Sequence, residues 1–335
     1  MASTDHQRLL TKVSQFYYFD ELTQAEIASR LRLSRQKVQR LIREARESGI
    51  VHIAIRPITG VFTELEARLQ KRFGLFEAVV VEASAYEDQA VVAREVGAGA
   101  AEYLLRIVRP HDRIVISWGG TLLGVVNMLA AEQPRQELEG VEVIQGLGGL
   151  GDPNNEAHAG DLTRRLAKFL GGSAQLLPAP GVAGSRASRD ALYGDPHVEQ
   201  VLEQGRRATL ALMGIGAPRR DSILVREGAI VRWNELTGLM KRGAVGDINL
   251  RYFDRCGRPV RSDLDERVVG LTLPEIQGIR HVVGVAGGAA KLEAIRGALE
   301  GKLIHALVTD QITAERLLLS AAARPSLKAK RKERG

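Results

Sequence analysis

Apolar runs of strand length alternate with helical stretches from about residue 76 to residue 320, and this alternation constrains the fold more than any other feature. Strands that are repeatedly followed by helices favour a mainly parallel sheet with helices on both faces. We therefore expect a Rossmann-like, mainly parallel α/β fold here. The strand-like runs are 78–82, 113–117, 141–145, 175–177, 209–213, 281–286 and 304–309, and the helical ones are 88–107, 121–131, 161–170, 198–207, 290–300 and 314–320.

One segment departs from this alternation. Residues 244–253 and 258–261 have the pattern of two strands, and the stretch 254–257 between them has the composition of a turn. This arrangement predicts a β-hairpin beside the parallel sheet.

The first sixty residues have a different, helical pattern. Residues 6–19 carry apolar side chains at helical spacing. Thr23 and Glu26 have the spacing of a capping box that begins a short second helix, and Ser34 can cap a third helix that runs to about Glu47. Two short helices joined by a turn of three or four residues are typical of a helix-turn-helix.

The third of these helices would display side chains that suit DNA. Arg and Gln can form paired hydrogen bonds with base edges in the major groove, and further cations can neutralise phosphates. Residues 1–60 hold 10 Lys and Arg against 6 Asp and Glu, and residues 50–55 alternate like a strand that could form a wing. The alternative is an ordinary three-helix bundle with a solvated basic face. The DNA-binding candidates are Thr23, Gln24, Ser34, Arg35, Gln36, Lys37, Gln39, Arg40 and Arg43.

Composition argues against several classes of protein. No stretch reaches the roughly 20 apolar residues of a membrane span, and the polar first residues show no secretory signal. Cys256 is the only cysteine, which excludes internal disulfides and multi-cysteine zinc sites, so we expect a cytoplasmic protein. The seven histidines lack metal-site spacing and no catalytic constellation is recognisable. The sequence therefore predicts no metal, no cofactor and no enzyme.

Glycines stand where predicted strands pass into helices. The carboxyl ends of parallel strands meet at one edge of the sheet, where helix amides can bind an anion. One glycine loop also carries a lysine on the first helical turn, which can lean toward a phosphate or carboxylate. Tight strand-to-helix turns also need glycine for structural reasons alone, and this is the alternative. The candidate ligand-binding residues at these loops are Gly119, Gly120, Thr121, Gly287, Gly288 and Lys291.

Two aspartates near these loops are further candidates. Asp247 stands at the entrance to the predicted hairpin, where its carboxylate could accept hydrogen bonds from sugar hydroxyls or could stabilise its own turn. Asp310 follows the last predicted strand and is either a pocket acid or a helix cap, of which we favour the cap.

The order of motifs along residues 10–320 is also informative. They include Tyr17-Tyr18, LTQAEIA at 22–28, LSR at 33–35, SWGGTL at 117–122, Gly246-Asp247-Ile248, Gly287-Gly288 with Lys291, and LVTD at 307–310. In these motifs the chain resembles the SorC family of bacterial sugar-responsive transcriptional regulators. The resemblance implies an effector domain similar to the sugar-phosphate isomerase and deaminase fold, which binds a sugar, polyol or sugar phosphate without turning it over. It also implies dimers or tetramers on operator DNA.

The resemblance also carries site residues over by position. It implies that Asp247 and Lys291 bracket the effector, that the loop 119–121 holds its anionic or hydroxyl end, and that Gln145 is a further effector contact.

A helix between the two parts carries Leu65, Leu69 and Phe73 on one stripe. We consider this stripe a candidate for the seam between subunits, although it could instead dock on the body. The predicted domains are a helix-turn-helix domain over 1–58, a linker helix over 59–75, an effector-binding α/β domain over 76–322 and a basic, disordered tail over 323–335.

We therefore expect a transcriptional regulator of a carbohydrate or polyol operon, with operator DNA, a small effector and further copies of itself as partners. The alternative is a sugar-phosphate isomerase or deaminase with a basic N-terminal extension. That enzyme would need an acid/base pair over the sugar, and Asp247 and Lys291 have no second acid or histidine beside them in the pattern. A third hypothesis is a regulator whose α/β domain only oligomerises and whose pocket is vestigial.

Overall fold

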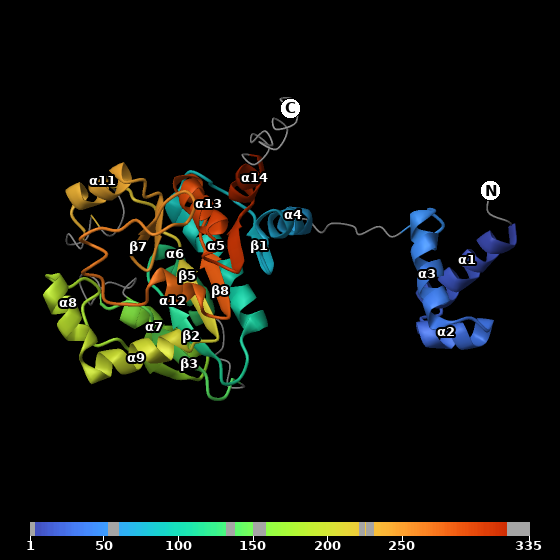
Figure 1. The fold of residues 1–335 in the computed structure, drawn as a ribbon, viewed down its shortest axis with the longest axis horizontal. Coiled ribbons are helices and arrows are strands. Elements are labelled where there is room, and N and C mark those ends of the chain that lie inside the picture. Colours follow the sequence, from blue (N-terminus) through green and yellow to red (C-terminus); the bar gives the residue numbers. More distant parts are fainter. Residues whose placement is uncertain are drawn as a thin grey trace, which may run out of the picture. The chain divides into compact units, whose positions relative to one another are not determined.

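The computed structural model describes residues 4–52, 60–131, 138–149, 159–220, 225 and 231–319. The chain divides into two compact units, residues Met1–Ile58 and Thr59–Gly335 (Figure 1). The predicted tail over 323–335 lies outside the described residues.

The first unit is a bundle of three helices, α1 (Thr4–Tyr18), α2 (Gln24–Leu31) and α3 (Arg35–Glu47). The predicted capping box is confirmed, because the Thr23 hydroxyl accepts from the Glu26 amide and the Glu26 carboxylate accepts from the Thr23 amide at 2.8 Å. Residues 50–52 form no strand, and the rest of the expected strand over 50–55 lies outside the described residues. The inner faces of the three helices form one apolar core of Leu10, Val13, Ile27, Ala28, Val38, Leu41, Ile42 and Ala45.

A seven-stranded sheet forms the centre of the second unit. Its strand order is β1-β9-β8-β5-β2-β3-β4, and every neighbouring pair is parallel, as the alternation of strands and helices predicts. All seven expected strands overlap observed ones. The bounds are β1 (Glu77–Val81), β2 (Arg113–Ile116), β3 (Glu142–Gln145), β4 (Ser173–Gln175), β5 (Leu210–Gly214), β8 (His281–Val285) and β9 (Ala306–Asp310).

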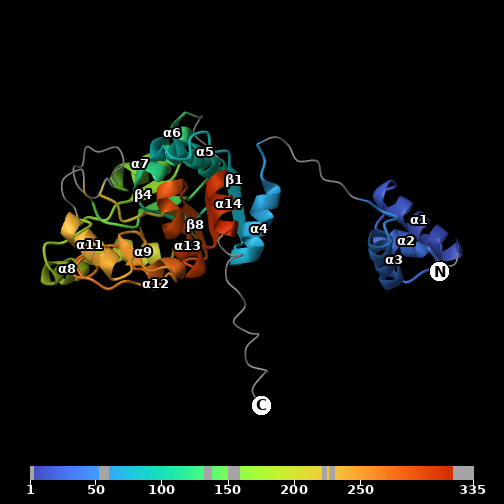
Figure 2. The same ribbon diagram turned by 90° about the horizontal axis from the view of Figure 1, so that it is seen from above.

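Helices cover both faces of this sheet. Alternate strand residues such as Ile114 and Val115 are therefore buried in opposite cores. One face carries α5 (Gln89–Ile107), α6 (Gly120–Ala130) and α7 (Ala159–Phe169), and Figure 2 shows them on the side opposite α9, α12 and α13. The other face carries α4 (Thr63–Phe73), α9 (Pro196–Arg206), α12 (Leu273–Gln277), α13 (Leu292–Glu300) and α14 (Gln311–Leu319).

The stripe on α4 is buried within the unit. Leu69 is 0% exposed and Phe73 is 8% exposed, both in the core of the sheet, and Leu65 packs against that core. The seam interpretation is therefore wrong for Leu69 and Phe73, since they have no surface left for a second subunit. The alternative, a helix that docks on the body, is correct.

The predicted reversal over 254–257 is present, but the single strand predicted over 244–253 contains a further turn. Strand β6 (Gly246–Ile248) pairs antiparallel with β7 (Arg251–Phe253), so the chain reverses at Asn249 and Leu250, inside the single strand predicted over 244–253. A second reversal over 254–257 is marked by the bridge between Phe253 and Pro259.

A small third core lies beside this hairpin. It joins the hairpin to α11 (Trp233–Lys241) and to the segment 264–268, and Trp118 packs against it. Three described helices of this unit were not predicted, α8 (Arg186–Tyr193), α11 and α12, and the helix predicted over 290–300 begins as the 3₁₀ turn η1 (Ala289–Lys291).

Candidate functional site

The carboxyl ends of the strands bring distant segments of the second unit together. The ammonium Nζ of Lys291, in η1 after β8, lies 3.3 Å from the hydroxyl Oγ1 of Thr121, at the start of α6 after β2. These two predicted residues are thus neighbours, as parallel strand ends require. Thr121 is 3% exposed, whereas Lys291 is half-buried.

Asp247 lies in β6 and also forms an antiparallel bridge to Gly216, the second residue after β5. Its side chain is 6% exposed, and the hydrogen bond that it accepts from the described residues comes from the Leu250 amide at 3.2 Å. Burial raises the pKa of the Asp247 carboxyl to about 6, although the Leu250 amide and the nearby Lys291 ammonium both lower it. Burial in turn lowers the pKa of Lys291 to about 8, and the charge of Asp247 opposes this change. The charges of the two predicted residues therefore interact.

The glycine loop after β2 is open. Gly119 has a φ of 116°, a conformation that favours glycine, and it begins α6 with no side chain capping the helix. A Cβ atom added at Gly119 or Gly120 would meet nothing within 4 Å. The N-terminus of α6 thus offers backbone amides and the positive end of the helix dipole beside Lys291 and Thr121, which suits an anion.

The glycine loop after β8 has a different role from the one expected. The Gly288 amide donates to the Asp310 carboxylate at 2.7 Å and to the Thr313 hydroxyl at 3.1 Å. A Cβ atom at Gly287 would lie 2.3 Å from an Asp310 oxygen. Gly287 and Gly288 therefore allow Asp310 to hold the loop, so the Gly288 amide is not free for a ligand. Asp310 also accepts from the Thr313 amide at 2.8 Å, which agrees with the cap that we favoured.

Gln145 is engaged in the fold. Its amide nitrogen donates to the Leu147 carbonyl at 2.7 Å and its amide oxygen accepts from the Leu177 amide at 3.3 Å. These bonds fix the chain after β3, so the side chain lines the edge of the sheet with its main polar atoms already used.

Asn249 is a residue of this region that the sequence reasoning missed. Its amide nitrogen donates to the carbonyls of Gly146, at 2.9 Å, and Leu271, at 3.1 Å, and its oxygen accepts from the Ser117 hydroxyl at 3.3 Å. It is 1% exposed and has a φ of 59°, a turn conformation that Asn tolerates better than most residues. Asn249 thus ties the hairpin that carries Asp247 to the ends of β2 and β3. An Asn two residues after Asp247 was the available signal for a turn.

In the first unit, α2 and α3 are joined by a short turn. Arg32 ends α2 in a left-handed conformation with a φ of 52°, and the Ser34 hydroxyl accepts from the Lys37 amide at 3.2 Å to cap α3. The predicted contacts on α3 all lie on its exposed side, opposite the buried Val38 and Leu41. These exposed residues are Arg35, Gln36, Lys37, Gln39, Arg40 and Arg43.

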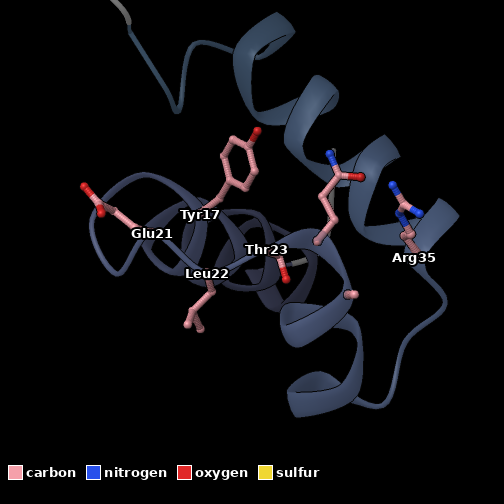
Figure 3. A pocket seen from close by; sticks show the side chains of 7 residues that line it. Tyr17, Glu21, Leu22, Thr23 and Arg35 are labelled. Carbon is pink, nitrogen blue, oxygen red and sulfur yellow. The ribbon is translucent and has the colours of Figure 1, made fainter.

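A hollow of about 650 Å³ opens beside the first turn of α3. Figure 3 shows the side chains of Tyr17, Thr23 and Arg35 around it, from the end of α1, the cap of α2 and the start of α3. It brings the predicted Thr23, Gln24 and Arg35 to one place. The sequence reasoning did not include Tyr17 among the DNA-binding candidates, and its aromatic ring next to polar residues at a helix end was the available signal.

No described helix has the length and apolarity to cross a membrane. The described residues contain no cluster of three or more His, Cys, Asp or Glu side chains that could hold a metal ion.

Comparisons with known proteins show which proteins this chain is similar to. The profile of a family described as "Putative sugar-binding domain" matches residues 58–319. The deoxyribonucleoside regulator of Bacillus subtilis is 32% identical over 94% of this chain and 98% of its own, and the sorbitol operon regulator of Klebsiella pneumoniae is 31% identical over 95% and 100%. The crystal structure of full-length SorC from K. pneumoniae matches with a TM-score of 0.69 and 30% identity, over 94% of this chain and all of that one.

Proposed function

The chain belongs to the SorC family of sugar-binding transcriptional regulators, and from this premise we propose that it regulates a carbohydrate or polyol operon in response to a small effector bound at the strand ends. The observation that carries the proposal is the meeting of Lys291, Thr121 and Asp247 at one edge of the sheet. The names of its relatives, which refer to a deoxyribonucleoside and to a sorbitol operon, support a ligand of the sugar or polyol class.

We infer the chemistry of the effector from the two ends of this site. Lys291 and the N-terminal amides of α6, at Gly119 and Gly120, form a cationic end rich in donors, which suits a phosphate or another anion. Asp247 supplies an acceptor, which suits hydroxyl groups. A sugar phosphate or polyol phosphate satisfies both ends, and an unphosphorylated polyol satisfies the hydroxyl end. Gln145, Gly287 and Gly288 contribute by shaping the edge of the sheet.

The first unit supports the DNA-binding half of the proposal. We infer that α2 and α3 are a helix-turn-helix and that α3 enters the major groove. Gln36, Gln39 and Arg40 would then read base edges, while Lys37 and Arg43 would contact phosphates. The remaining predicted contacts, at the start of α2 and of α3, are Thr23, Gln24, Ser34 and Arg35.

We also propose that the effector is bound and not converted. Proton transfer on a sugar needs a second acid or base beside Asp247 and Lys291. Asp310 is a further acid at this edge, and it is already bonded to the Gly288 amide and the Thr313 hydroxyl. This engagement favours a binding site over a catalytic one.

We propose that each predicted domain has its own function. Residues 1–58 bind DNA, residues 59–75 form a linker helix, and residues 76–322 bind the effector. Because one helix-turn-helix reads one half-site, the working form should be a dimer or a tetramer. Light scattering at micromolar concentration tests this, and a monomer with and without effector would contradict it.

The replacement of Lys291 by alanine tests the effector site. A charge-assisted hydrogen bond contributes roughly 1.5–3 kcal/mol, so Lys291→Ala should weaken effector binding about ten- to a hundredfold. Its affinity for DNA, measured without effector on duplexes selected from a random pool, should stay unchanged. Lys168→Ala, which alters an exposed lysine on α7, is the matched control. Calorimetry that gives equal effector affinity for Lys291→Ala and the parent would move the site elsewhere.

A further inference from the structure

One buried hydroxyl beside the proposed effector site has no hydrogen-bond partner among the described residues. Tyr252, in β7, lies directly opposite Asp247 across the hairpin. Directly opposed residues of an antiparallel pair project to the same face, with Cβ atoms about 5 Å apart. Tyr252 is 3% exposed, and its hydroxyl Oη makes no hydrogen bond to any described residue.

A buried hydroxyl without a partner destabilises the folded protein, so its presence needs a reason. The ring of Tyr252 alone would serve the small third core, where it packs with Leu147, Leu250 and Val268, and phenylalanine would supply the same ring. The hydroxyl is near enough to Asp247 that the carboxylate charge, after burial, raises the pKa of Tyr252 further.

Within the described part of the chain, Asp247 itself has unused capacity to accept hydrogen bonds. A carboxylate has about four acceptor positions, and the hydrogen bond from the Leu250 amide occupies one. Its other oxygen lies against the backbone of Gly216, where a Cβ atom would come within 2.1 Å. The face of the hairpin thus presents an acceptor and, beside it, a hydroxyl that can donate.

We propose that Tyr252 is a specificity residue of the effector site and that, together with Asp247, it recognises two neighbouring hydroxyl groups of the effector. One ligand hydroxyl donates to the Asp247 carboxylate, and the adjacent ligand oxygen accepts from the Tyr252 hydroxyl. The inference rests on the proposed function, and it narrows the ligand to sugars or polyols that bring a vicinal diol to the hairpin.

Tyr252→Phe tests this proposal because it removes only the hydroxyl. The probes are ribose 5-phosphate, 2-deoxyribose 5-phosphate, fructose 6-phosphate and glucitol 6-phosphate, with inorganic phosphate as the reference. For the compound that binds the full-length parent most tightly, calorimetry should show about tenfold weaker binding to Tyr252→Phe. An analogue of that compound without one hydroxyl of the diol should bind parent and variant alike.

The ligand-free protein gives a second readout that separates recognition from structure. If the hydroxyl serves only the ligand, Tyr252→Phe should melt at the same temperature as the parent or higher, because an unpaired polar group has been removed. Tyr103→Phe is the matched control, since it removes a buried hydroxyl that is bonded to His281 at 2.9 Å, at the amino end of β8.

The outcomes separate this inference from the proposed function. Unchanged affinity in Tyr252→Phe, with weaker binding in Asp247→Asn, overturns the role of Tyr252 and leaves the effector site in place. An equal loss for the diol and for its deoxy analogue also overturns that role. If none of the four compounds binds, both proposals are overturned.

Discussion

Asparagine in place of Asp247 removes a buried charge while it keeps the size of the side chain and an oxygen for the Leu250 amide. Burial raises the pKa of Asp247 from 3.8 to about 6. Each pH unit of this interval corresponds to about 1.4 kcal/mol, so the folded protein carries the ionised carboxylate at a cost of about 3 kcal/mol. We therefore expect Asp247→Asn to raise the free energy of unfolding of the ligand-free protein at pH 7.5 by as much as about 3 kcal/mol.

The effect depends on pH in a direction that can be checked. Because the pKa of Asp247 is higher in the folded state than in the unfolded state, its contribution to stability is fully present below pH 3.8 and is lost as the pH rises through about 6. The advantage of the variant should thus be small near pH 4 and complete at pH 7.5. Urea unfolding followed by circular dichroism measures it at both values.

A matched variant and a binding assay complete the experiment. Asp263→Asn removes an exposed aspartate, and it should leave the free energy of unfolding unchanged at both pH values. In the same preparations, Asp247→Asn should bind the effector at least tenfold more weakly, because asparagine lacks the carboxylate charge that strengthens the bond to a hydroxyl. A variant that is no more stable than the parent at pH 7.5 refutes the reasoning about the buried charge.

Three further predictions concern the DNA-binding unit and the packing of the effector site. Gln36→Ala should cost about 1–3 kcal/mol on the selected DNA and relax its specificity, whereas Arg43→Ala should weaken binding to all sequences and reduce its salt dependence, as fluorescence anisotropy at several salt concentrations can show. Thr23→Ala removes the cap of α2, so thermal melting of the first unit should show a loss of about 1 kcal/mol, and an unchanged melting curve would contradict the role of the capping box. Gly216→Ala places a Cβ atom 2.1 Å from the Asp247 carboxylate, so effector affinity by calorimetry should fall more than tenfold, and full affinity would mean that the carboxylate is not a contact.

The parallel sheet was predictable because its strands are buried on both faces. Strands such as β5 and β8 are nearly continuous apolar runs, with helices between them, and few folds satisfy that pattern. The capping box at Thr23 and the cap at Ser34 were predictable for a related reason, since both depend on residues at most three positions apart. Contacts between residues that are close in the sequence can be recognised from the residue types and their spacing.

The hairpin shows where this reasoning fails. Its turn is formed by Asn249 and Leu250, both with a φ of 59°, and neither is the glycine that usually marks such a turn. A leucine in this conformation is strained, and it is stable here because Leu250 is 0% exposed in the third core and its amide donates to Asp247. The fold stabilises this turn through contacts that the sequence pattern does not reveal.

The candidate site likewise contains contacts that the sequence predicts and contacts that it does not. That Thr121 and Lys291 meet could be predicted, because both follow parallel strands and such strands end at one edge. That Asp310 occupies the Gly288 amide could not, since the two residues are 22 positions apart and the bond depends on how β8 and β9 are aligned. A glycine at a strand end indicates close packing, but the packed group is known only from the fold.

Asp247 and Lys291 also explain why a ligand should stabilise this unit. Burial disfavours the charged form of each, with pKa values of about 6 and 8, so near neutral pH both charges are kept at a cost to the fold. A ligand that donates to the carboxylate and presents an anion to the ammonium favours both charged forms and offsets that cost. Asn249 bonds the hairpin of Asp247 to Ser117 and Gly146, so the carboxylate stays beside the loops that would hold the rest of the ligand. The site is therefore assembled before the ligand arrives, and binding relieves a penalty that the folded protein already carries.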